Sequence, residues 1–295
     1  MSDTAANLHR KIASAAELES VVRTMKAMAA ASVTQYENAV RALDDYYRTV
    51  QLGLAACFQH NEPWDAAAPV PTSKTGGIIA ITFGSDQGLV GPFNEILAEF
   101  VVATVENRPG KKTLWTVGER IQSRLADTHL DKGASFNLPN AIGAITPLVG
   151  QILLGIEARH EAGDLREIHL FHNRPQSGGN YTPVSQQLLP LDNEWQRHLA
   201  TITWPTGSWP EVLAGAAQTL PALVREYLFV TLFRACAESL ASENASRLAA
   251  MQRAEKNIDE LQEDLKRTYH RLRQSSIDEE LFDVVAGFEA LSELK

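Results

Sequence analysis

The chain has 295 residues, of which 44% are hydrophobic and 21% are charged. These values are ordinary for a globular protein, and the length allows one large domain or two modest ones with a buried core. The formal net charge is −9, which provides no basic stripe to displace counterions from phosphates, so we expect no nucleic-acid partner.

The first predicted element is one long helix over residues 1–60. From residue 5 to residue 58 the chain contains no proline, and its only glycine is Gly53. Steps of four and three residues from Leu8 to Leu54 reach apolar positions throughout, except at Glu19 and Lys26. An apolar period of 3.5 residues predicts a coiled-coil helix of about 80 Å, which needs a partner helix to cover its apolar stripe.

Residues 72–206 are predicted to form an α/β domain. Short runs rich in Ile, Val, Leu and Thr predict strands at 76–83, 113–118, 166–173 and 186–191. Helical patterns fall between them at 94–106, 118–126 and 146–160. Strands that alternate with helices predict a parallel or mostly parallel sheet.

Residues 208–295 are predicted to form the partner helix. Ser208, Pro210 and Glu211 fit a capping box at its start, and Pro221 is expected to kink or restart it. Beyond Pro221 apolar residues keep helical spacing, and in the acidic stretch 255–264 the apolar side chains are expected to face inward. The inward residues are Ile258 and Leu261 within the stretch and Leu265 just after it. Two long helices from opposite ends of the chain can therefore pair antiparallel.

The turn FGSDQGLVGPF at 83–93 raises the possibility of a phosphate-binding loop. A P-loop needs Lys and then Ser or Thr after its second glycine, whereas Leu89 and Val90 follow Gly88. The glycine spacing also differs from the dinucleotide fingerprint G-x-G-x-x-G. We interpret the segment as a tight turn in which glycines supply positive φ, Asp86 caps the backbone and Asn94 or its neighbours open a helix.

No other motif indicates an active site. His169 and His172 lie three residues apart on a predicted strand and point to opposite faces, so one metal ion cannot easily bind both. No nucleophile-elbow sequence surrounds a serine, and Cys57 and Cys236 form no disulfide framework. We therefore predict no catalytic residues, no metal site and no cofactor.

Targeting and membrane signals are weak. The first fourteen residues lack the apolar core of a signal peptide. The most apolar window, 141–156, is interrupted by Pro147 and by glycines, so we expect no direct membrane span. Docking on a membrane complex stays open.

One stretch is more specific than helix periodicity requires. Residues 238–257 read ESLASENASRLAAMQRAEKN, and the segments VVRTMKAMAAAS (21–32), ITFGSDQGLVGPFN (81–94) and RQSSIDEELFDVV (273–285) accompany it in order. Together these segments resemble the gamma subunit of F-type ATP synthases, the central rotor stalk, over nearly the whole chain.

The resemblance implies a fold and a set of partners. The fold is an antiparallel coiled coil of the N- and C-terminal helices with an inserted Rossmann-like α/β domain. The partners are a ring of three alpha and three beta subunits, the epsilon subunit and the ion-carrying c-ring. The implied role is a non-catalytic, peripheral rotor subunit at the cytoplasmic face of the bacterial plasma membrane, which couples proton or sodium flow to ATP synthesis or hydrolysis.

The resemblance also implies two sets of contact residues. The first set is an apolar tip that turns in an apolar sleeve, where contacts are weak and non-directional. The second set comprises polar and Met positions that contact the beta subunits. The tip residues are Leu281, Val284, Val285, Phe288 and Leu291, and the contact candidates are Arg23, Met25, Lys26, Arg247, Arg273 and Gln274.

Several positions depart from the family pattern. Val90 and Pro92 stand where the loop usually has Cys and Gly, and His270, Leu272 and Phe288 replace the usual residues further on. These departures indicate a divergent branch, such as the alternative F-type ATPases of some bacteria. Two other functions stay open, namely a nucleotide-binding α/β enzyme, which would bind ATP or NAD alone, and a coiled-coil scaffold without preference for alpha and beta subunits.

Overall fold

A computed structural model describes residues 4–59, 76–191, 195, 199, 201–208, 210–211 and 215–292, without the side chains of 58, 59, 216, 217 and 288–292. The chain forms two compact units. The larger unit is Ala30–Arg247, and the smaller one joins Met1–Ala29 to Leu248–Lys295. Two helices run through both units.

The two terminal helices are α1 (Ala5–Gln59) and α6 (Ala216–Ser292). The predicted start of the C-terminal helix at Ser208 is wrong, because 205–208 form a bend and the helix begins at Ala216. Gly215, with φ +74°, precedes this start in a conformation that a helix does not contain. The helix is continuous through Pro221 rather than restarted there.

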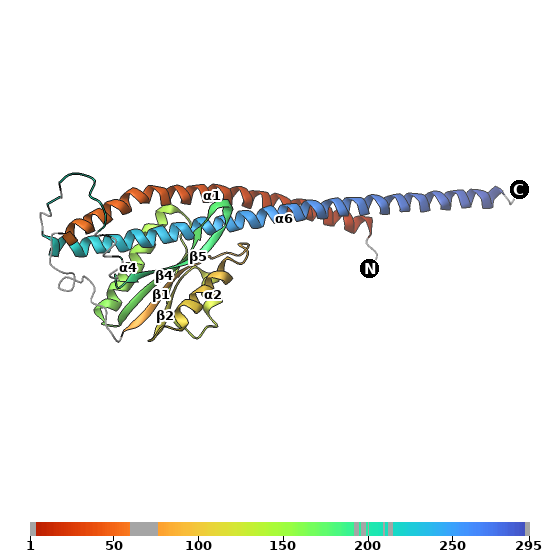
Figure 1. Ribbon diagram of the computed structural model, residues 1–295. Coiled ribbons are helices and arrows are strands. Elements are labelled where there is room, and N and C mark those ends of the chain that lie inside the picture. Colours follow the sequence, from red (N-terminus) through yellow and green to blue (C-terminus); the bar gives the residue numbers. More distant parts are fainter. Residues whose placement is uncertain are drawn as a thin grey trace. The chain divides into compact units, whose positions relative to one another are not determined.

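A five-stranded sheet forms the centre of the larger unit (Figure 1). Its order is β3-β2-β1-β4-β5, with β5 antiparallel and the other pairs parallel. This confirms the predicted mostly parallel sheet and the Rossmann-like arrangement around a central β1. The strands are β1 (Gly77–Phe83), β2 (Lys112–Val117), β3 (Asp131–Phe136), β4 (Leu165–Pro175) and β5 (Tyr181–Leu189).

The connecting helices confirm the three predicted between strands. They are α2 (Phe93–Glu106), α3 (Glu119–Leu125) and α4 (Ile145–Glu161), and short 3-10 turns lie at Ile142–Ala144 and Ser177–Gly179. Figure 1 shows α2 beside the sheet and the two long helices on the other side of it. The sheet therefore separates two helical layers within this unit.

The sequence did not predict β3, and it predicted only the end of β5. β3 reads DKGASF, which has low strand propensity, and it is an edge strand whose side chains are mostly exposed. β5 begins at Tyr181 and contains Pro183, which a strand tolerates only at an edge. Edge strands lack the continuous apolar pattern by which the central strands are recognised.

Each face of the sheet has its own core. On one face, residues of β1 and β4 pack against α1, α4 and α6, with Leu54, Ile152 and Val230 among the fully buried contacts. On the other face, α2 and α3 pack over β1, β2 and β4. Leu97 and Ile121 are fully buried in this second core.

The helix Ile142–Glu161 is long and apolar enough to cross a membrane by length and composition alone. Six of its residues, including Val149 and Ile152, are nevertheless buried in the core of the larger unit. This packing accounts for the apolar character of these six positions.

α1 and α6 are antiparallel in both units. In the larger unit Arg234 bonds Asp44 and the ring of Tyr227 lies 5.9 Å from that of Tyr47. In the smaller unit His9 lies beside Tyr269 and Lys26 bonds Glu255. All fourteen predicted seam positions from Leu8 to Leu54 are buried or partly buried, so the 3.5-residue period is confirmed.

The seam of α6 differs from the prediction at one position. Leu261 is 51% exposed, and the neighbouring Gln262 is buried in its place. Gln262 Nε2 donates to Glu19 Oε2 at 2.8 Å. The phase of the α6 stripe is therefore set by its partner helix, because Glu19 supplies a polar position that an amide satisfies and a leucine does not.

Candidate functional site

Three serines on one face of α6 attach this helix to the sheet. Ser239 Oγ donates to the carbonyl of Phe83 at 3.0 Å, and Ser242 Oγ donates to that of Asn173 at 2.9 Å. Ser246 Oγ donates to the carbonyl of Val90. The spacing of three and four residues puts all three hydroxyls on the same side of the helix. Residues 238–246 (ESLASENAS) therefore bind the carboxyl ends of β1 and β4 and the turn after β1 through hydrogen bonds.

The turn after β1 is bonded within itself. Asn94 accepts the Ser85 N–H at 3.0 Å and donates to Ser85 Oγ at 2.8 Å. Asp86 Oδ1 accepts the backbone N–H of Glu119, so this carboxylate caps the start of α3 rather than its own turn. The expected role of Asp86 is corrected in that respect.

Only one of the three glycines in this turn has positive φ. Gly91 has φ +58°, whereas Leu89 adopts φ +62° without being glycine. At Gly84 the requirement is space, because a Cβ would lie 2.2 Å from Ile121 Cβ. The expected tight turn is present, but close packing rather than conformational freedom explains Gly84.

Glu238 forms a buried charged cluster where α6 meets β4. Its carboxylate accepts hydrogen bonds from His172 Nε2 at 2.8 Å, Arg234 Nε at 2.9 Å and Arg174 Nε at 3.1 Å. Burial alone would raise the pKa of Glu238, but these bonds outweigh it and lower the pKa to about 2. Burial lowers the pKa of His172, so this imidazole is neutral at pH 7. The cluster holds a carboxylate and gives no acid–base pair poised near neutrality.

His169 lies on the opposite face of β4. Its Nε2 is 3.1 Å from Glu167, which also bonds Arg108. Burial lowers the pKa of His169, as it does for His172. The two histidines therefore have separate partners, and no group of three potential metal ligands occurs among the described residues.

Arg247 directly follows the last of the three serines. It donates to Glu243 at 2.6 Å, and only 13% of its side chain is exposed. Burial raises the pKa of Glu243, and Arg247 opposes this shift. The structure thus gives this contact candidate an internal partner.

Polar residues interrupt the seam of the smaller unit. Lys26 Nζ lies 2.6 Å from Glu255 Oε2, and Arg23 lies 3.6 Å from the same carboxylate. Arg23 also bonds Glu19, the residue that accepts from Gln262. The two polar seam positions of α1 that the sequence reveals are therefore matched by polar groups on α6.

An exposed apolar stripe runs along the flank of α1 in the smaller unit. Leu18, Val21 and Met28 are 57%, 56% and 66% exposed, and Met25 is partly buried. The spacing of three, four and three residues aligns them on one side of the helix. Of these, only Met25 was singled out from the sequence, through its match to a family motif.

The end of α6 presents further exposed apolar side chains. Leu281, Val284 and Val285 are 60%, 70% and 46% exposed, and Phe282 is 72% exposed. The side chains of Phe288 and Leu291 lie outside the described ones. Arg273 and Gln274 are exposed on the preceding turns. Exposing such an apolar stripe to water is unfavourable. Stripes of this kind are typical of surfaces that bind a partner protein.

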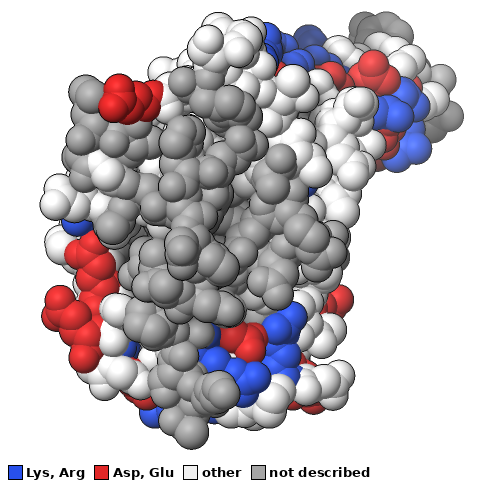
Figure 2. All heavy atoms as spheres, turned by 60° about the vertical axis from the view of Figure 1, so that its left-hand side comes forward, with Lys and Arg blue, Asp and Glu red and all other residues white. Residues whose placement is uncertain are grey.

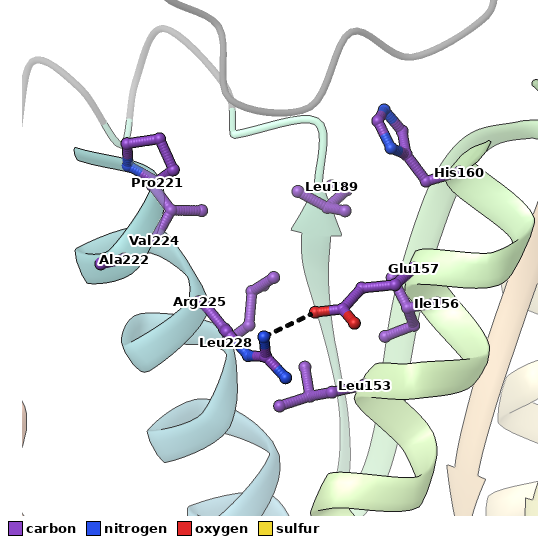
Figure 3. A pocket seen from close by; sticks show the side chains of 10 residues that line it. All are labelled: Leu153, Ile156, Glu157, His160, Leu189, Pro221, Ala222, Val224, Arg225 and Leu228. Atoms are coloured by element: carbon purple, nitrogen blue, oxygen red, sulfur yellow. Dashed lines mark ion pairs between the residues drawn. The ribbon is translucent and has the colours of Figure 1, made fainter. Parts of the chain in front are cut away.

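The surface carries both signs of charge and an apolar cavity. Figure 2 shows both basic and acidic side chains along the edges of this face. A largely apolar cavity of about 420 Å³ lies between α4 and α6, and an ion pair between Arg225 and Glu157 spans it (Figure 3).

Comparison with known proteins identifies the family. The family model described as ATP synthase matches residues 4–291. The chain belongs to the ATP synthase gamma family. Its relatives include the ATP synthase gamma chains of Glaesserella parasuis, 28% identical with 97% of this chain and 99% of the relative covered, and of Brevibacillus brevis, 26% identical with 96% and 97% covered. The recognised family is thus confirmed.

Solved structures show the same fold for this gamma-family chain. The rotor of the Euglena gracilis mitochondrial ATP synthase aligns with a TM-score of 0.63 at 16% identity, covering 92% of this chain and 98% of that one. The central stalk and c-ring structure from Tetrahymena thermophila aligns with a TM-score of 0.54 at 18% identity, covering 79% and 99%. These likenesses confirm the predicted fold class.

Proposed function

We propose that the chain is the central stalk of an F-type ATP synthase and rotates inside a ring of three alpha and three beta subunits. The observation that carries this proposal is the long antiparallel helix pair of a gamma-family chain, with apolar side chains exposed at its end. The relatives are named gamma chains, and the structural neighbours are described as rotor and central stalk. The epsilon subunit and the c-ring complete the proposed set of partners.

In this role the chain acts by differential binding. An asymmetric shaft contacts each beta subunit differently, so the three catalytic sites hold different affinities at one instant. Rotation moves the preferred contact from one site to the next, which is a coupling between sites rather than a chemical step. The chain is then a non-catalytic part of a membrane-bound complex, and we place it at the cytoplasmic face of the bacterial plasma membrane.

The polar groups of the turn after β1 support the non-catalytic assignment. Ser85 and Asn94 bond each other, and Asp86 caps α3. The carbonyl of Val90 accepts from Ser246. These bonds fix the turn internally, to α3 and, through Val90, to α6, so we assign the turn a structural role instead of phosphate binding.

Two sets of residues are proposed to meet the ring. The tip from Leu281 onward would turn in an apolar sleeve, because its exposed side chains offer weak, non-directional contacts. Arg23 and Met25 lie at the exposed flank of α1, and Arg273 and Gln274 lie on exposed turns of α6. Lys26 and Arg247 already bond Glu255 and Glu243, so their contact would be made by the part that stays exposed.

Reconstitution tests the proposal directly. The full chain is co-expressed with alpha and beta subunits from one source, and complexes are separated by size exclusion. We expect a complex that contains one copy of this chain per ring and hydrolyses ATP. Equilibrium dialysis of the isolated chain with ATP and NAD is the control. Micromolar binding of either nucleotide together with failure to join the ring would favour the enzyme alternative and refute the stalk.

A further inference from the structure

The cavity between α4 and α6 has a largely apolar wall and a charged rim. Leu153 and Ile156 of α4 face Val224 and Leu228 of α6 across it (Figure 3). Arg225 Nη1 lies 3.3 Å from Glu157 Oε1, and His160 lines the cavity further along α4. All of these residues belong to the larger unit. An apolar cavity with a few polar groups at one side is the usual form of a site for a small amphiphilic molecule.

The volume of the cavity and the charged side chains that line it limit the class of ligand that it can bind. A volume of about 420 Å³ equals about fourteen water-sized volumes, which is the size of a chain of roughly ten to twelve carbons with a small head group. The side chains of Arg225 and Glu157 are 59% and 44% exposed, so their mutual attraction is weak. A guanidinium can exchange such a partner for a carboxylate that it binds through two parallel hydrogen bonds.

We propose that this cavity binds a single-chain amphiphile with an anionic head, such as an alkyl carboxylate. The alkyl chain lies between α4 and α6, and the head group replaces Glu157 at Arg225. This site is separate from the stalk function and does not depend on it.

A chain-length series provides the first test. Binding of hexanoate, octanoate, decanoate and tetradecanoate to the full chain is measured by titration calorimetry below their micellar concentrations. Affinity should rise by up to about fourfold per methylene and then level off near ten to twelve carbons, when the cavity is full. An affinity that keeps rising with length, or that does not depend on it, would refute a cavity of this size.

Opposite effects of two variants provide the second test. Arg225→Gln should weaken decanoate binding about tenfold, because the head group loses its charged donor. Glu157→Gln should strengthen it about threefold, because a competing carboxylate is removed. Arg159→Gln is the matched control, since this arginine lies on α4 and bonds Asp164 instead of lining the cavity. Shifts of the same sign in the first two variants would overturn the proposed head-group position.

A blocking variant separates the cavity from the rest of the surface. Ala222 lines the cavity and is exposed, so Ala222→Trp fills its mouth without replacing a core residue. It should abolish binding with an unchanged melting curve, whereas Ala103→Trp on the exposed face of α2 should bind as wild type does. Flotation with phosphatidylglycerol vesicles distinguishes the two sources of the ligand. If the cavity binds a bilayer lipid, wild type floats with the vesicles and Ala222→Trp does not. If it binds a free carboxylate, neither protein floats. Equal decanoate binding by both Trp variants would exclude the cavity.

Discussion

Glu238 connects three elements through one carboxylate. It accepts bonds from His172 and Arg174 of β4 and from Arg234 of α6, and Arg234 in turn bonds Asp44 of α1. Only 6% of the Glu238 side chain is exposed. A buried carboxylate of this kind is costly to leave unpaired, and so are the groups around it once it is removed.

The stability of the chain should therefore depend on Glu238 in a pH-dependent way. The pKa of Glu238 falls from 4.5 to about 2 on folding, so its contribution is present above about pH 5 and is lost as pH falls toward 2. A shift of this size corresponds to about 3 kcal/mol. In urea unfolding, the difference in free energy of unfolding between wild type and Glu238→Gln should shrink over that interval.

The control for this measurement is Glu99→Gln, at an exposed position on α2. This variant measures how much the loss of one exposed carboxylate by itself changes the free energy of unfolding at each pH. A difference between wild type and Glu238→Gln that is the same at pH 7 and at pH 3 would contradict the assigned ion pairs.

Gly84 makes a second prediction at the scale of one residue. A methyl group there would lie 2.2 Å from Ile121 Cβ and 2.9 Å from Asn94 Oδ1. We expect Gly84→Ala to lower the free energy of unfolding by about 3 kcal/mol, because the turn after β1 and α3 must move apart. Gly150→Ala, in α4 with no atom near the added carbon, should instead be neutral or stabilising by up to about 1 kcal/mol. Equal melting temperatures for the two variants would show that the turn is not packed as described.

At the scale of the helix pair, the polar seam sets how α1 and α6 align in the smaller unit. Glu19 pairs with Gln262, and Lys26 pairs with Glu255. Buried polar positions in coiled coils specify register at a cost in stability. This seam therefore selects one antiparallel alignment among those that an apolar stripe alone would permit.

Replacing one polar pair tests this role. Glu19→Leu with Gln262→Leu should raise the stability of the smaller unit by about 1 kcal/mol in urea, because two polar groups are no longer buried. In the same double variant α1 and α6 should no longer keep a single alignment. Cysteines placed at His9 and Tyr269, and at their neighbours, would then form disulfides at shifted positions as well. Gln262→Leu alone should destabilise the unit, since Glu19 then loses its amide donor. A double variant that is less stable than both single variants would contradict this account.

At the scale of the whole molecule, the end of α6 and the larger unit should be separable. Residues 281–287 are exposed and contribute nothing to the cores of the larger unit. We expect deletion of 281–295 to leave the unfolding of the larger unit unchanged. The same deletion should reduce assembly with the alpha and beta subunits and the torque measured on single molecules. Unfolding of the α/β domain after truncation would refute this division of roles.

Much of the fold was predictable because its signals are local. The seam from Leu8 to Leu54 follows a 3.5-residue period, and β1 is a continuous apolar run because both of its faces are buried. The family was recognisable from residues 238–257, a segment of α6 whose serines all face the sheet. β3 escaped prediction because an exposed edge strand has no such apolar pattern.

The candidate site was predictable in its segments but not in its contacts. The sequence alone determined two long helices around an α/β domain, because helix and strand periodicity depend on neighbouring residues. The tertiary structure decided that His172 meets Glu238, that Asp86 caps α3 and that Gln262 rather than Leu261 faces α1. These pairings join residues far apart in the chain, and each depends on how one packed element is rotated against another, which no local pattern specifies.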